Sequence, residues 1–518
     1  MYPERMSGTT KRSDITSPGA PMTVAASDRL HTGGWFSDRA VAVTGIAVFA
    51  VVTALYLILP FWSLGLHIPL NPNEGWNALQ SERALGPGAL YPDGDAFFFN
   101  NYPPLSFYIV GLFGQAIGDN ILAGRILSLI ATFVIAGNIV WIVRNLGGSS
   151  RYAIFAGLLF LGILSKSYTL YVGVDDPQLL AHAVMSAGFA VFTGSRPGRG
   201  RLAAAAALMV TAGMIKHNIF AMPLAATTWL LVNDRRAAER WVIYAATCLV
   251  AAFALCWLSY GTAFFDQLGS PRSYSLYRVV TLLGWIQGFL IPLVVWAIFA
   301  ARVQGDSRVS LVNHLLAAGA IAFAVTRTGE GVSVNSFFDW IIGASIATGL
   351  VLSRLAEMPN IERYGVVRMR AVIVGLLCLR LIVLPQNELV KIVLGTELAA
   401  STRAQDHNAL LDIALMRQLA GPAICEELTL CYWSGHPSAY DEFNAGQAFK
   451  TRARDINVLR QQITAGRYRL IQLAHNSPLL DATRAAGLVE RTRPGGQLIF
   501  AGEAKALGAD AASPPALR

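Results

Sequence analysis

The chain has 518 residues, of which 54% are hydrophobic and only 14% are charged. Charged residues make up about 25% of an ordinary soluble protein, so this composition excludes a typical cytosolic enzyme and indicates a membrane protein. The formal net charge of +9 must first be mapped onto the loops of such a protein, and it does not by itself indicate a nucleic-acid partner.

Apolar segments recur between residues 41 and 385, each near the length that a helix needs to cross a hydrocarbon core of about 30 Å. The strands of a transmembrane barrel would alternate apolar and polar side chains, whereas residues 202–210 are apolar throughout. We therefore predict an all-α polytopic membrane protein with about 11 transmembrane helices. The predicted spans are 41–62, 121–143, 152–170, 178–194, 202–215, 218–232, 241–262, 281–301, 309–326, 336–353 and 371–385.

Residues 1–40 precede the first span and are rich in Ser, Thr, Gly, Pro and mixed charges. This composition predicts a disordered tail. Because about forty polar residues precede the first apolar run, that run is interpreted as a retained signal anchor and not as a cleavable signal peptide.

The apolar stretch from 104 to 118 decides on which side of the membrane the later loops lie. If it does not cross, the N-terminal tail and the loops on its side carry 19 Lys and Arg, while the opposite short loops carry 5. Basic residues favour the cytoplasmic side, so we expect a short helix at the outer face, starting near Pro104. The protein is then predicted in the plasma membrane, with a cytoplasmic N-terminus and its C-terminal region outside.

The first outer loop has about forty residues and is too long and too aromatic for a simple connector. It contains Glu74, Glu82 and Tyr102, and Tyr102 is a candidate for substrate binding. Glu82 is interpreted as a solvated acid, like Asp93 and Asp95 further along the loop. Glu74 begins an amphipathic segment that should rest on the membrane surface, so we expect its carboxylate to point into a partly desolvated cleft, with a solvated acid as the alternative.

The second outer loop is very short and contains Asp175 and Asp176 at the mouth of a helix. Asp176 followed by Pro177 is a good N-cap and N1 pair, which gives a purely structural interpretation. One cap needs only one carboxylate, however. Two adjacent acids opposite Glu74 are therefore also candidates for a general base or a divalent-metal site.

Three basic or ionisable side chains are expected at the same face. Lys216 and His217 lie in a turn between two short apolar runs, and Arg125 lies at the outer start of a span. Such side chains can simply extend to the membrane surface. Alternatively, cations near two carboxylate loops could hold a phosphate group.

A further outer loop contains Glu330 and Asn335 at the start of a span, and both are candidates for substrate binding. The alternative for Asn335 is a helix cap. A Walker loop, a dinucleotide fingerprint, an HExxH zinc motif and a GxSxG nucleophile elbow are all missing in a supporting context. We therefore predict no soluble nucleotide cofactor, and a divalent cation remains open.

Residues 386–518 differ in composition, with 14 Lys and Arg, 13 Asp and Glu, and only short apolar runs. We predict a soluble α/β domain outside the membrane, with a helix near 458–463 and strands near 468–473 and 497–501. Cys425 and Cys431 can form a disulfide only if the chain doubles back between them. The last ten or so residues are predicted to be disordered.

The order of these motifs resembles the GT-C superfamily of integral membrane glycosyltransferases. The closest likeness is to the protein O-mannosyltransferase and aminoarabinose transferase group and its bacterial relatives, and it covers about 41–385. The tail is also similar to the external domains of some bacterial members. The segments that carry the resemblance are NEGWNALQSERAL, LYP, NNYPPLSFYIVG, DDP, KHN and GEGVSVNSFFDW.

The resemblance implies an inverting hexosyl or pentosyl transferase that uses a sugar on a polyprenyl phosphate. The acceptor would be a glycan, a lipid or a protein outside the membrane. Glu74 matches the acidic base of the first outer loop, Asp175 or Asp176 matches the acid of the second loop, and Lys216 matches a position that contacts the lipid phosphate. Many members carry Asp or Asp-Glu where this chain has Asn73-Glu74, which puts the base assignment in question.

The competing hypothesis is a transporter or flippase of lipid-linked intermediates. Such a protein usually places ionisable residues near the bilayer midplane on broken helices and shows internal repeats, and neither feature is clear in this sequence. A membrane-held scaffold or adhesin would not explain the clustered acids. The sequence therefore favours the transferase.

Overall fold

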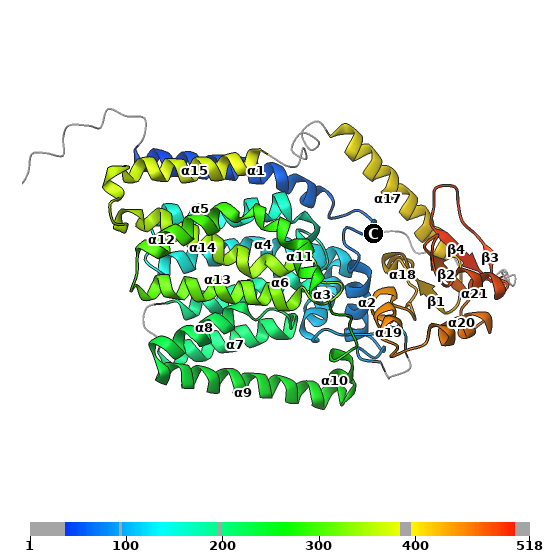
Figure 1. Cartoon of the computed structure of the whole chain (residues 1–518). Helices are drawn as coiled ribbons and strands as arrows, with labels where there is room; N and C mark the ends of the chain where they lie inside the picture. The colour runs from blue at the N-terminus through cyan, green and yellow to red at the C-terminus, as the bar shows by residue number, and fades with distance from the viewer. Residues whose placement is uncertain (1–36, 93–95, 195–197, 384–394, 503–518) are drawn as a thin grey trace, which may run out of the picture.

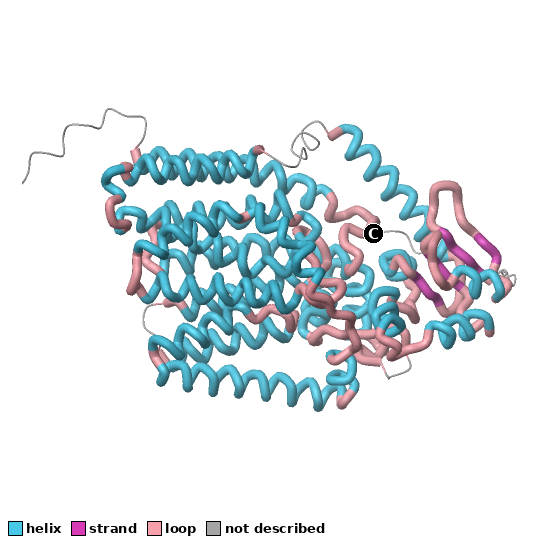
Figure 2. Tube along the Cα trace, in the orientation of Figure 1, coloured by secondary structure: helices cyan, strands magenta, loops and turns pink. Residues whose placement is uncertain are grey.

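The computed structural model describes residues 37–92, 96–194, 198–383 and 395–502. These residues form a bundle of helices and, beside it, a smaller C-terminal unit (Figure 1). In Figure 2 the strands lie in this C-terminal unit, and the bundle is drawn entirely as helices and loops. The predicted tail at 1–40 lies outside the described residues except for its end, where the first helix already begins at Asp38.

The bundle consists of helices of widely different length, from the six-residue α10 to the 26-residue α4. In chain order they are α1 (Asp38–Trp62), α2 (Glu74–Leu85), α3 (Leu105–Ile117), α4 (Asn120–Asn145), α5 (Ser150–Ser167), α6 (Pro177–Phe192), α7 (Arg199–Ile215), α8 (Ala221–Asn233), α9 (Arg235–Tyr260), α10 (Ala263–Leu268), α11 (Tyr277–Leu282), α12 (Leu290–Arg302), α13 (Ser307–Thr326), α14 (Phe338–Arg354) and α15 (Val366–Ile382). Short 3₁₀ turns η1 (Thr169–Tyr171), η2 (Leu283–Gly288) and η3 (Val334–Phe337) interrupt the loops.

A helix lies at each predicted span, but the span at 281–301 is broken. There α11 and η2 meet α12 at an angle of 81°. Pro292 lies in the first turn of α12, where the N–H that proline lacks would have no partner within the helix. If the helix continued unbroken through this position, the missing N–H would remove a backbone hydrogen bond. Gly284 and Gly288 weaken the same stretch. The predicted span at 281–301 is therefore either one broken span or a re-entrant segment.

By length and composition, five of the described helices can cross a membrane, or six if the bent pair counts as one span. They are α1, α4, α9, α13 and the segment Val334–Glu357 that contains α14. Several other helices of the bundle are shorter than the length expected of a full span. The count of eleven therefore stays a prediction, whereas a mostly helical apolar bundle is confirmed.

The apolar stretch at 104–118 forms α3, a short helix of 13 residues. At 1.5 Å per residue it is about 20 Å long, which is less than the thickness of a hydrocarbon core. Gly118 ends it with a φ of 89°, a left-handed conformation that suits glycine. The prediction of a short helix that does not cross is consistent with this length.

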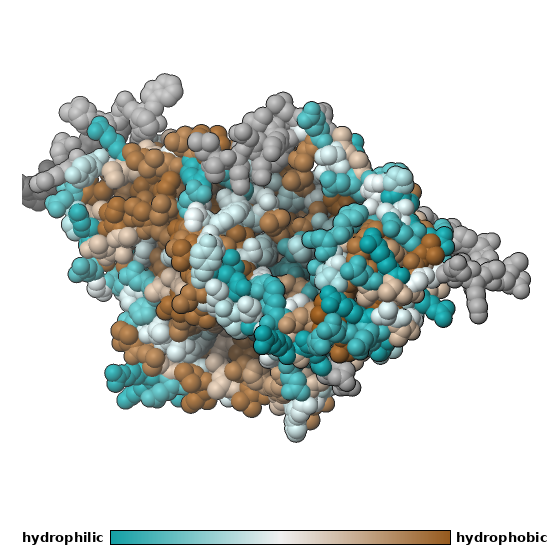
Figure 3. Space-filling model, turned by 45° about the vertical axis from the view of Figure 1, so that its right-hand side comes forward, coloured by the Kyte–Doolittle hydropathy of each residue, from teal (hydrophilic) through white to brown (hydrophobic). Residues whose placement is uncertain are grey.

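The outside of the bundle carries many apolar side chains. On α9, Leu255, Trp257 and Leu258 are 66%, 57% and 77% exposed. In Figure 3 the hydrophobic surface gathers over the bundle, whereas hydrophilic surface dominates over the C-terminal unit. Apolar surface of this extent is expected where helices contact lipid.

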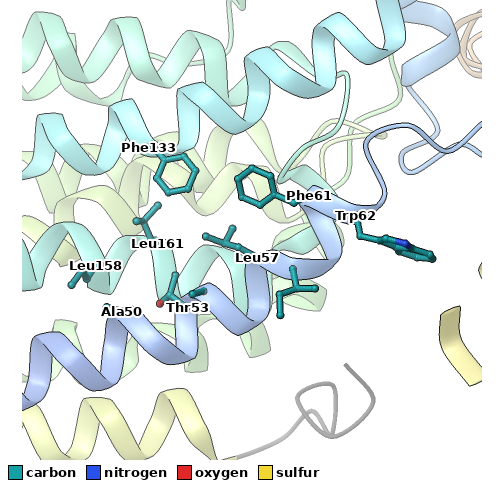
Figure 4. Close-up of a pocket in the computed structure, with 10 residues that line it drawn as sticks. Ala50, Thr53, Leu57, Phe61, Trp62, Phe133, Leu158 and Leu161 are labelled. Carbon is teal, nitrogen blue, oxygen red and sulfur yellow. The ribbon is translucent and has the colours of Figure 1, made fainter. Parts of the chain in front are cut away.

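An apolar cleft of about 670 Å³ lies along the outside of α1, between α1, α4 and α5. Figure 4 shows Leu57, Phe61, Phe133 and Leu161 around it, with Thr53 at its floor. None of its lining residues is ionisable. The cleft therefore supplies no acid–base chemistry, and the candidate site lies elsewhere.

The C-terminal unit contains a sheet in the order β1-β2-β4-β3, in which β1 and β2 are parallel and the other pairs are antiparallel. Its elements are α17 (Thr396–Arg417), β1 (Ala423–Cys425), α18 (Leu428–Ser434), α19 (Glu442–Lys450), α20 (Ile456–Thr464), β2 (Leu470–Leu473), α21 (Leu480–Ala485), β3 (Val489–Glu490) and β4 (Leu498–Ala501). The predicted helix and both predicted strands are thus confirmed, as α20, β2 and β4. The solubility of this unit stays a prediction, and the predicted disordered end at 509–518 lies outside the described residues.

The chain doubles back between β1 and α18, and Cys425 and Cys431 form a disulfide there. Their Cα atoms are 6.0 Å apart, within the range that a disulfide allows. The bridge ties the end of β1 to α18, the helix of the C-terminal unit that packs against α2.

Candidate active site

Glu74 is the first residue of α2 and is completely buried. The Asn71 side chain accepts a hydrogen bond from the Asn73 N–H at 3.0 Å, which forms the turn that leads into the helix. The Leu70 N–H donates to Glu74 Oε2 at 2.8 Å. The prediction that this carboxylate points into a partly desolvated cleft was wrong, because neighbouring segments enclose it fully.

Arg125 of α4 accounts for this burial. Its Nε donates to Glu74 Oε1 and its Nη2 donates to Glu74 Oε2, both at 2.8 Å. This two-point contact is the strongest geometry for an arginine and a carboxylate. The remaining N–H groups of Arg125 donate to the carbonyls of Ser63, Leu64, Leu66 and Ile68. The Glu74–Arg125 pair therefore fastens the loop after α1 and the start of α2 to α4.

Asp175 lies beside this pair. Its N–H donates to Glu74 Oε1 at 3.0 Å, and its own Oδ2 is buried without a hydrogen-bond partner among the described residues. A Cβ on Gly124 would lie 1.9 Å from Asp175 Oδ1, so α4 needs glycine there. Burial, together with the negative charges of Glu74 and Asp176, raises the pKa of Asp175 well above its usual range.

Asp176 is the helix cap that one of the two interpretations of the sequence predicts, and it also forms an ion pair. Its Oδ1 accepts the Gln178 N–H at 2.8 Å, which caps α6 with Pro177 at the first helical position. The same oxygen accepts from Lys216 Nζ at 2.8 Å, and both side chains are only 2% exposed. Asn73 Nδ2 donates to Asp176 Oδ2 over a longer distance of 3.3 Å. Asp176 is therefore a helix cap and one half of a buried ion pair.

Lys216 ends α7 and faces inward. Burial is the largest single effect and lowers its pKa, but Asp176 and Tyr102 together outweigh it and raise the pKa of Lys216 above its ordinary value. The ammonium group also lies 4.9 Å from the centre of the Tyr102 ring, a cation–π distance. Because the side chain does not reach the solvent, the interpretation of Lys216 as a surface-seeking lysine was wrong.

His217 is exposed next to Lys216, and its ring centre is 6.0 Å from that of Tyr102. Desolvation and the cations of Lys216 and Arg272 lower the pKa of His217 to about 4. The imidazole is therefore neutral at pH 7. It can accept or donate a hydrogen bond at the edge of the site without adding a charge.

Asn335 joins the site from another loop. Its Nδ2 donates to Gln178 Oε1 at 2.9 Å, while its Oδ1 accepts the Ser333 N–H at 3.0 Å. It makes no side-chain cap of η3, so the helix-cap alternative was wrong. Gln178, which the sequence gave no reason to select, thus connects the loop before α14 to the first turn of α6.

Glu330 faces away toward the C-terminal unit. Its carboxylate pairs with Arg278 at 2.8 Å and with Lys450 of α19. These partners lower the pKa of Glu330, the Lys450 hydrogen bond most strongly. The structure therefore assigns Glu330 to the contact of the loop after α13 with α11 and α19, and it does not bring this residue to Glu74 or Asp176.

Helix α18 of the C-terminal unit also reaches the site, through Trp433 and Tyr432. The ring of Trp433 lies near Arg125, and the Tyr432 hydroxyl accepts the Asn120 N–H at 2.5 Å. Only the resemblance of the surrounding segment to external domains of related proteins could have drawn attention to these residues. Neither periodicity nor spacing indicates them.

The possibility of a metal site depends on how the acids are arranged. In the described part of the chain, no group of three or more His, Cys, Asp or Glu could hold a metal ion. Glu74 and Asp176 are each engaged by a cation of the protein, Arg125 and Lys216. This arrangement does not fit a divalent cation held by these acids.

The model of the dolichyl-phosphate-mannose-protein mannosyltransferase family matches residues 101–260. Among solved structures, the chain is similar to apo ArnT from Cupriavidus metallidurans, with a TM-score of 0.62, 17% identity, and coverage of 89% of this chain and 98% of ArnT. The same ArnT bound to undecaprenyl phosphate gives a TM-score of 0.61 at 16% identity, covering 87% of this chain and 97% of that one.

A more distant similarity is to the oligosaccharyltransferase AglB from Archaeoglobus fulgidus in complex with an inhibitory peptide and a dolichol-phosphate. Its TM-score is 0.50 at 10% identity, with coverage of 83% of this chain and 69% of AglB. None of the curated proteins matches the chain closely enough to count as a relative. Together the comparisons show that the chain has a GT-C fold of the ArnT type.

Proposed function

We propose that this chain, whose fold is that of the GT-C membrane glycosyltransferases, moves a sugar from a polyprenyl-phosphate donor to an acceptor hydroxyl at the outer face of the plasma membrane. The observation that carries the proposal is the meeting of the Glu74–Arg125 and Asp176–Lys216 ion pairs at one end of the bundle. Four separate segments supply these residues. Related structures with a polyprenyl or dolichyl phosphate in their names support the class of donor.

The general base is assigned to Asp176. A base needs an oxygen with a free lone pair within reach of the proton, and Lys216 Nζ contacts only one of the two carboxylate oxygens, Oδ1, at 2.8 Å. Its Oδ2 accepts only the long hydrogen bond from Asn73. Burial raises the pKa of Asp175 and so disfavours its charged form, which makes Asp176 the preferred base of the two.

Glu74 has a different task from the one that the family resemblance implies. Arg125, the Leu70 N–H and the Asp175 N–H already donate to its two oxygens. Taking a proton from a substrate would disrupt this set of bonds. Glu74 therefore serves to hold the backbone of Asp175, and with it the neighbouring Asp176, in place.

The reaction is a single displacement at the anomeric carbon. The oxygen of the acceptor hydroxyl bonds to that carbon while Asp176 accepts the proton of the hydroxyl. At the same time the bond from the carbon to the phosphate oxygen breaks. The polyprenyl phosphate leaves as a stable anion, so an acid catalyst is not required. Lys216 supplies positive charge for this leaving group. Attack opposite the leaving group inverts the configuration of the sugar.

The test uses the purified full chain in lipid nanodiscs, incubated with a membrane lipid extract that contains polyprenyl-phosphate sugars and with envelope glycolipids and glycoproteins. Mass spectrometry should show one envelope species that gains a sugar while free polyprenyl phosphate accumulates. Asp176→Asn protein should not produce this species. Movement of the lipid-linked sugar across the bilayer without any transfer would contradict the proposal and favour a flippase.

A further inference from the structure

We infer that Trp433, in helix α18 of the C-terminal unit, is a positioning residue for the Glu74–Arg125 pair, which makes the C-terminal unit a working part of the active site. The inference rests on the proposed function for its kinetic consequence. Its structural basis is a series of contacts that runs from the sheet of the C-terminal unit to the acidic cluster.

The first contact is the close packing of α18 against α2. A Cβ on Gly75 would lie 2.2 Å from the Thr429 backbone nitrogen and 2.3 Å from the Leu428 carbonyl carbon. Real Cβ atoms do not approach backbone atoms so closely. Gly75 follows Glu74 directly, so the C-terminal unit touches the helix that carries this acid within one residue of it.

The second contact fixes the indole N–H of Trp433. It donates to Asp119 Oδ2 at 3.0 Å. The other oxygen of Asp119 caps α4 by accepting the Ile121 N–H at 2.8 Å and the Leu122 N–H at 3.2 Å. Arg125 lies in the second turn of this same helix. Trp433 is thereby joined to the end of the helix that carries the partner of Glu74.

The third contact is between the indole ring and the guanidinium group. Arg125 Cζ lies 5.9 Å from the ring centre of Trp433, within the range of a cation–π contact. The ring centre of His67, on the loop that Arg125 holds, lies 5.1 Å from the ring centre of Trp433. Trp433 is only 8% exposed. The ring therefore helps to keep water away from the Glu74–Arg125 pair, which strengthens the interaction of the two charges.

Trp433 itself is held from within the C-terminal unit. The Cys425–Cys431 disulfide fastens α18 to β1. Arg417 of α17 donates to the Trp433 carbonyl through Nε at 3.1 Å and through Nη2 at 2.8 Å. The C-terminal unit thus determines where the indole lies, and the indole in turn contacts the active-site arginine.

A positioning role predicts which kinetic constant changes. Glu74 accepts the Asp175 N–H, and Asp175 precedes the proposed base. Loss of the indole should let this set of residues shift, and a misplacement of about 1 Å can lower a rate about a hundredfold. Donor and acceptor binding should change little, because Trp433 does not contact the proposed base or Lys216.

The experiment compares Trp433→Phe and Trp433→Leu in the full chain, with Trp257→Leu on the lipid-facing surface of α9 as the matched control. We expect Trp433→Leu to lower kcat roughly tenfold to a hundredfold at unchanged KM for the donor. Trp433→Phe keeps an aromatic ring but loses the N–H that donates to Asp119, so its kcat should lie between those of Trp433→Leu and the wild type. Trp257→Leu should behave like the wild type. Wild-type kcat in Trp433→Leu, or a raised KM with normal kcat, would overturn the inference.

A second measurement does not depend on activity. Hydrogen–deuterium exchange in the 63–70 loop, where Arg125 donates to four carbonyls, should be faster in Trp433→Leu than in the wild type and unchanged in Trp257→Leu. Equal exchange in all three proteins would overturn the inference even if Trp433→Leu unfolds too readily for kinetics. If the wild-type protein exchanges as expected but transfers no sugar, the proposed function fails and the positioning of Arg125 by Trp433 stands.

Discussion

The two ends of the helix bundle hold their charges in different ways. At the end that carries α2 and the start of α6, the ion pairs are buried: the side chains of Glu74 and Arg125 are 0% and 1% exposed, and those of Asp176 and Lys216 are 2% each. Removing charges from water costs several kcal/mol for each ion. Such an arrangement is expected only where fixed charges serve a purpose beyond folding.

At the opposite end the ion pairs are partly exposed and serve the ends of helices. Asp38, 36% exposed, follows the N-cap of α1 and pairs with Arg370 at 2.7 Å. Asp306, 25% exposed, caps α13 and pairs with Arg354 at 2.5 Å. Pairs of this kind contribute about 0–1 kcal/mol. The difference teaches that burial, more than the presence of ion pairs, separates the candidate active site from ordinary helix termini.

The largest difference between the two ends should appear in the reaction itself. Replacing Asp176 with Asn should lower the rate of sugar transfer by about 10²- to 10⁴-fold, as expected for loss of a general base. The same change at Asp306 should leave the rate unchanged, although both residues cap helices. The measurement is the initial rate of transfer by the purified proteins.

A double variant separates chemistry from folding, because Asp176→Asn leaves Lys216 buried and unpaired. Adding Lys216→Gln removes this charge, so stability should recover while transfer stays low. Recovery of transfer in the double variant would show that Asp176 acts through folding and is not the base.

The next effect is on stability. Arg125→Met leaves Glu74 buried without its partner and should lower the free energy of unfolding by about 3–5 kcal/mol. Arg370→Met at the opposite end should cost less than about 1 kcal/mol. Denaturation of both proteins in the same detergent compares them directly, and equal losses would erase the distinction between the two ends.

A smaller effect should distinguish binding from catalysis. Lys216→Met should raise the KM for the polyprenyl-phosphate donor about tenfold to a hundredfold, because a charge-assisted contact to a phosphate contributes about 1.5–3 kcal/mol. Arg308→Met at the opposite end is the control and should leave this KM unchanged. A normal donor KM in Lys216→Met, measured in protein of confirmed fold, would restrict Lys216 to holding Asp176.

Local sequence patterns predicted much of the fold. Apolar runs located the helices, and the Asp176-Pro177 pair located the start of α6 together with its cap. The break at η2 was missed, since Pro292 and two glycines lie within an otherwise apolar run. A hydropathy pattern reports the length of a run and not a bend within it.

The pairing of the site residues was less predictable. Glu74 and Arg125 are 51 positions apart, and Asp176 and Lys216 are 40 apart. The shared side of the membrane indicated that they gather, but it could not show which cation each acid binds. For this reason the sequence placed Glu74 in a partly desolvated cleft, and only the family resemblance made it the base. The sequence gave no sign that Trp433 of a separate unit reaches the same place.

The smallest effects concern pH, and the two ends should respond with opposite signs. At Asp306, burial would raise the pKa, but Arg354 and the N–H groups of the α13 cap lower it overall. A lowered pKa means that this carboxylate stabilises the fold above its unfolded pKa of about 4 and loses that contribution as the pH falls. Asp306→Asn should therefore cost under about 1 kcal/mol at pH 7 and nothing in acid.

At Asp175 burial raises the pKa, so the folded state binds a proton that the unfolded state has already released above about pH 4. The fold then loses stability as the pH rises through this range and beyond. Asp175→Asn should remove that slope and stabilise the protein at pH 7, whereas Asp306→Asn destabilises it there. Denaturation of the three proteins between pH 4 and pH 8 measures both slopes, and slopes of the same sign would mean that the buried end is more hydrated than its geometry implies.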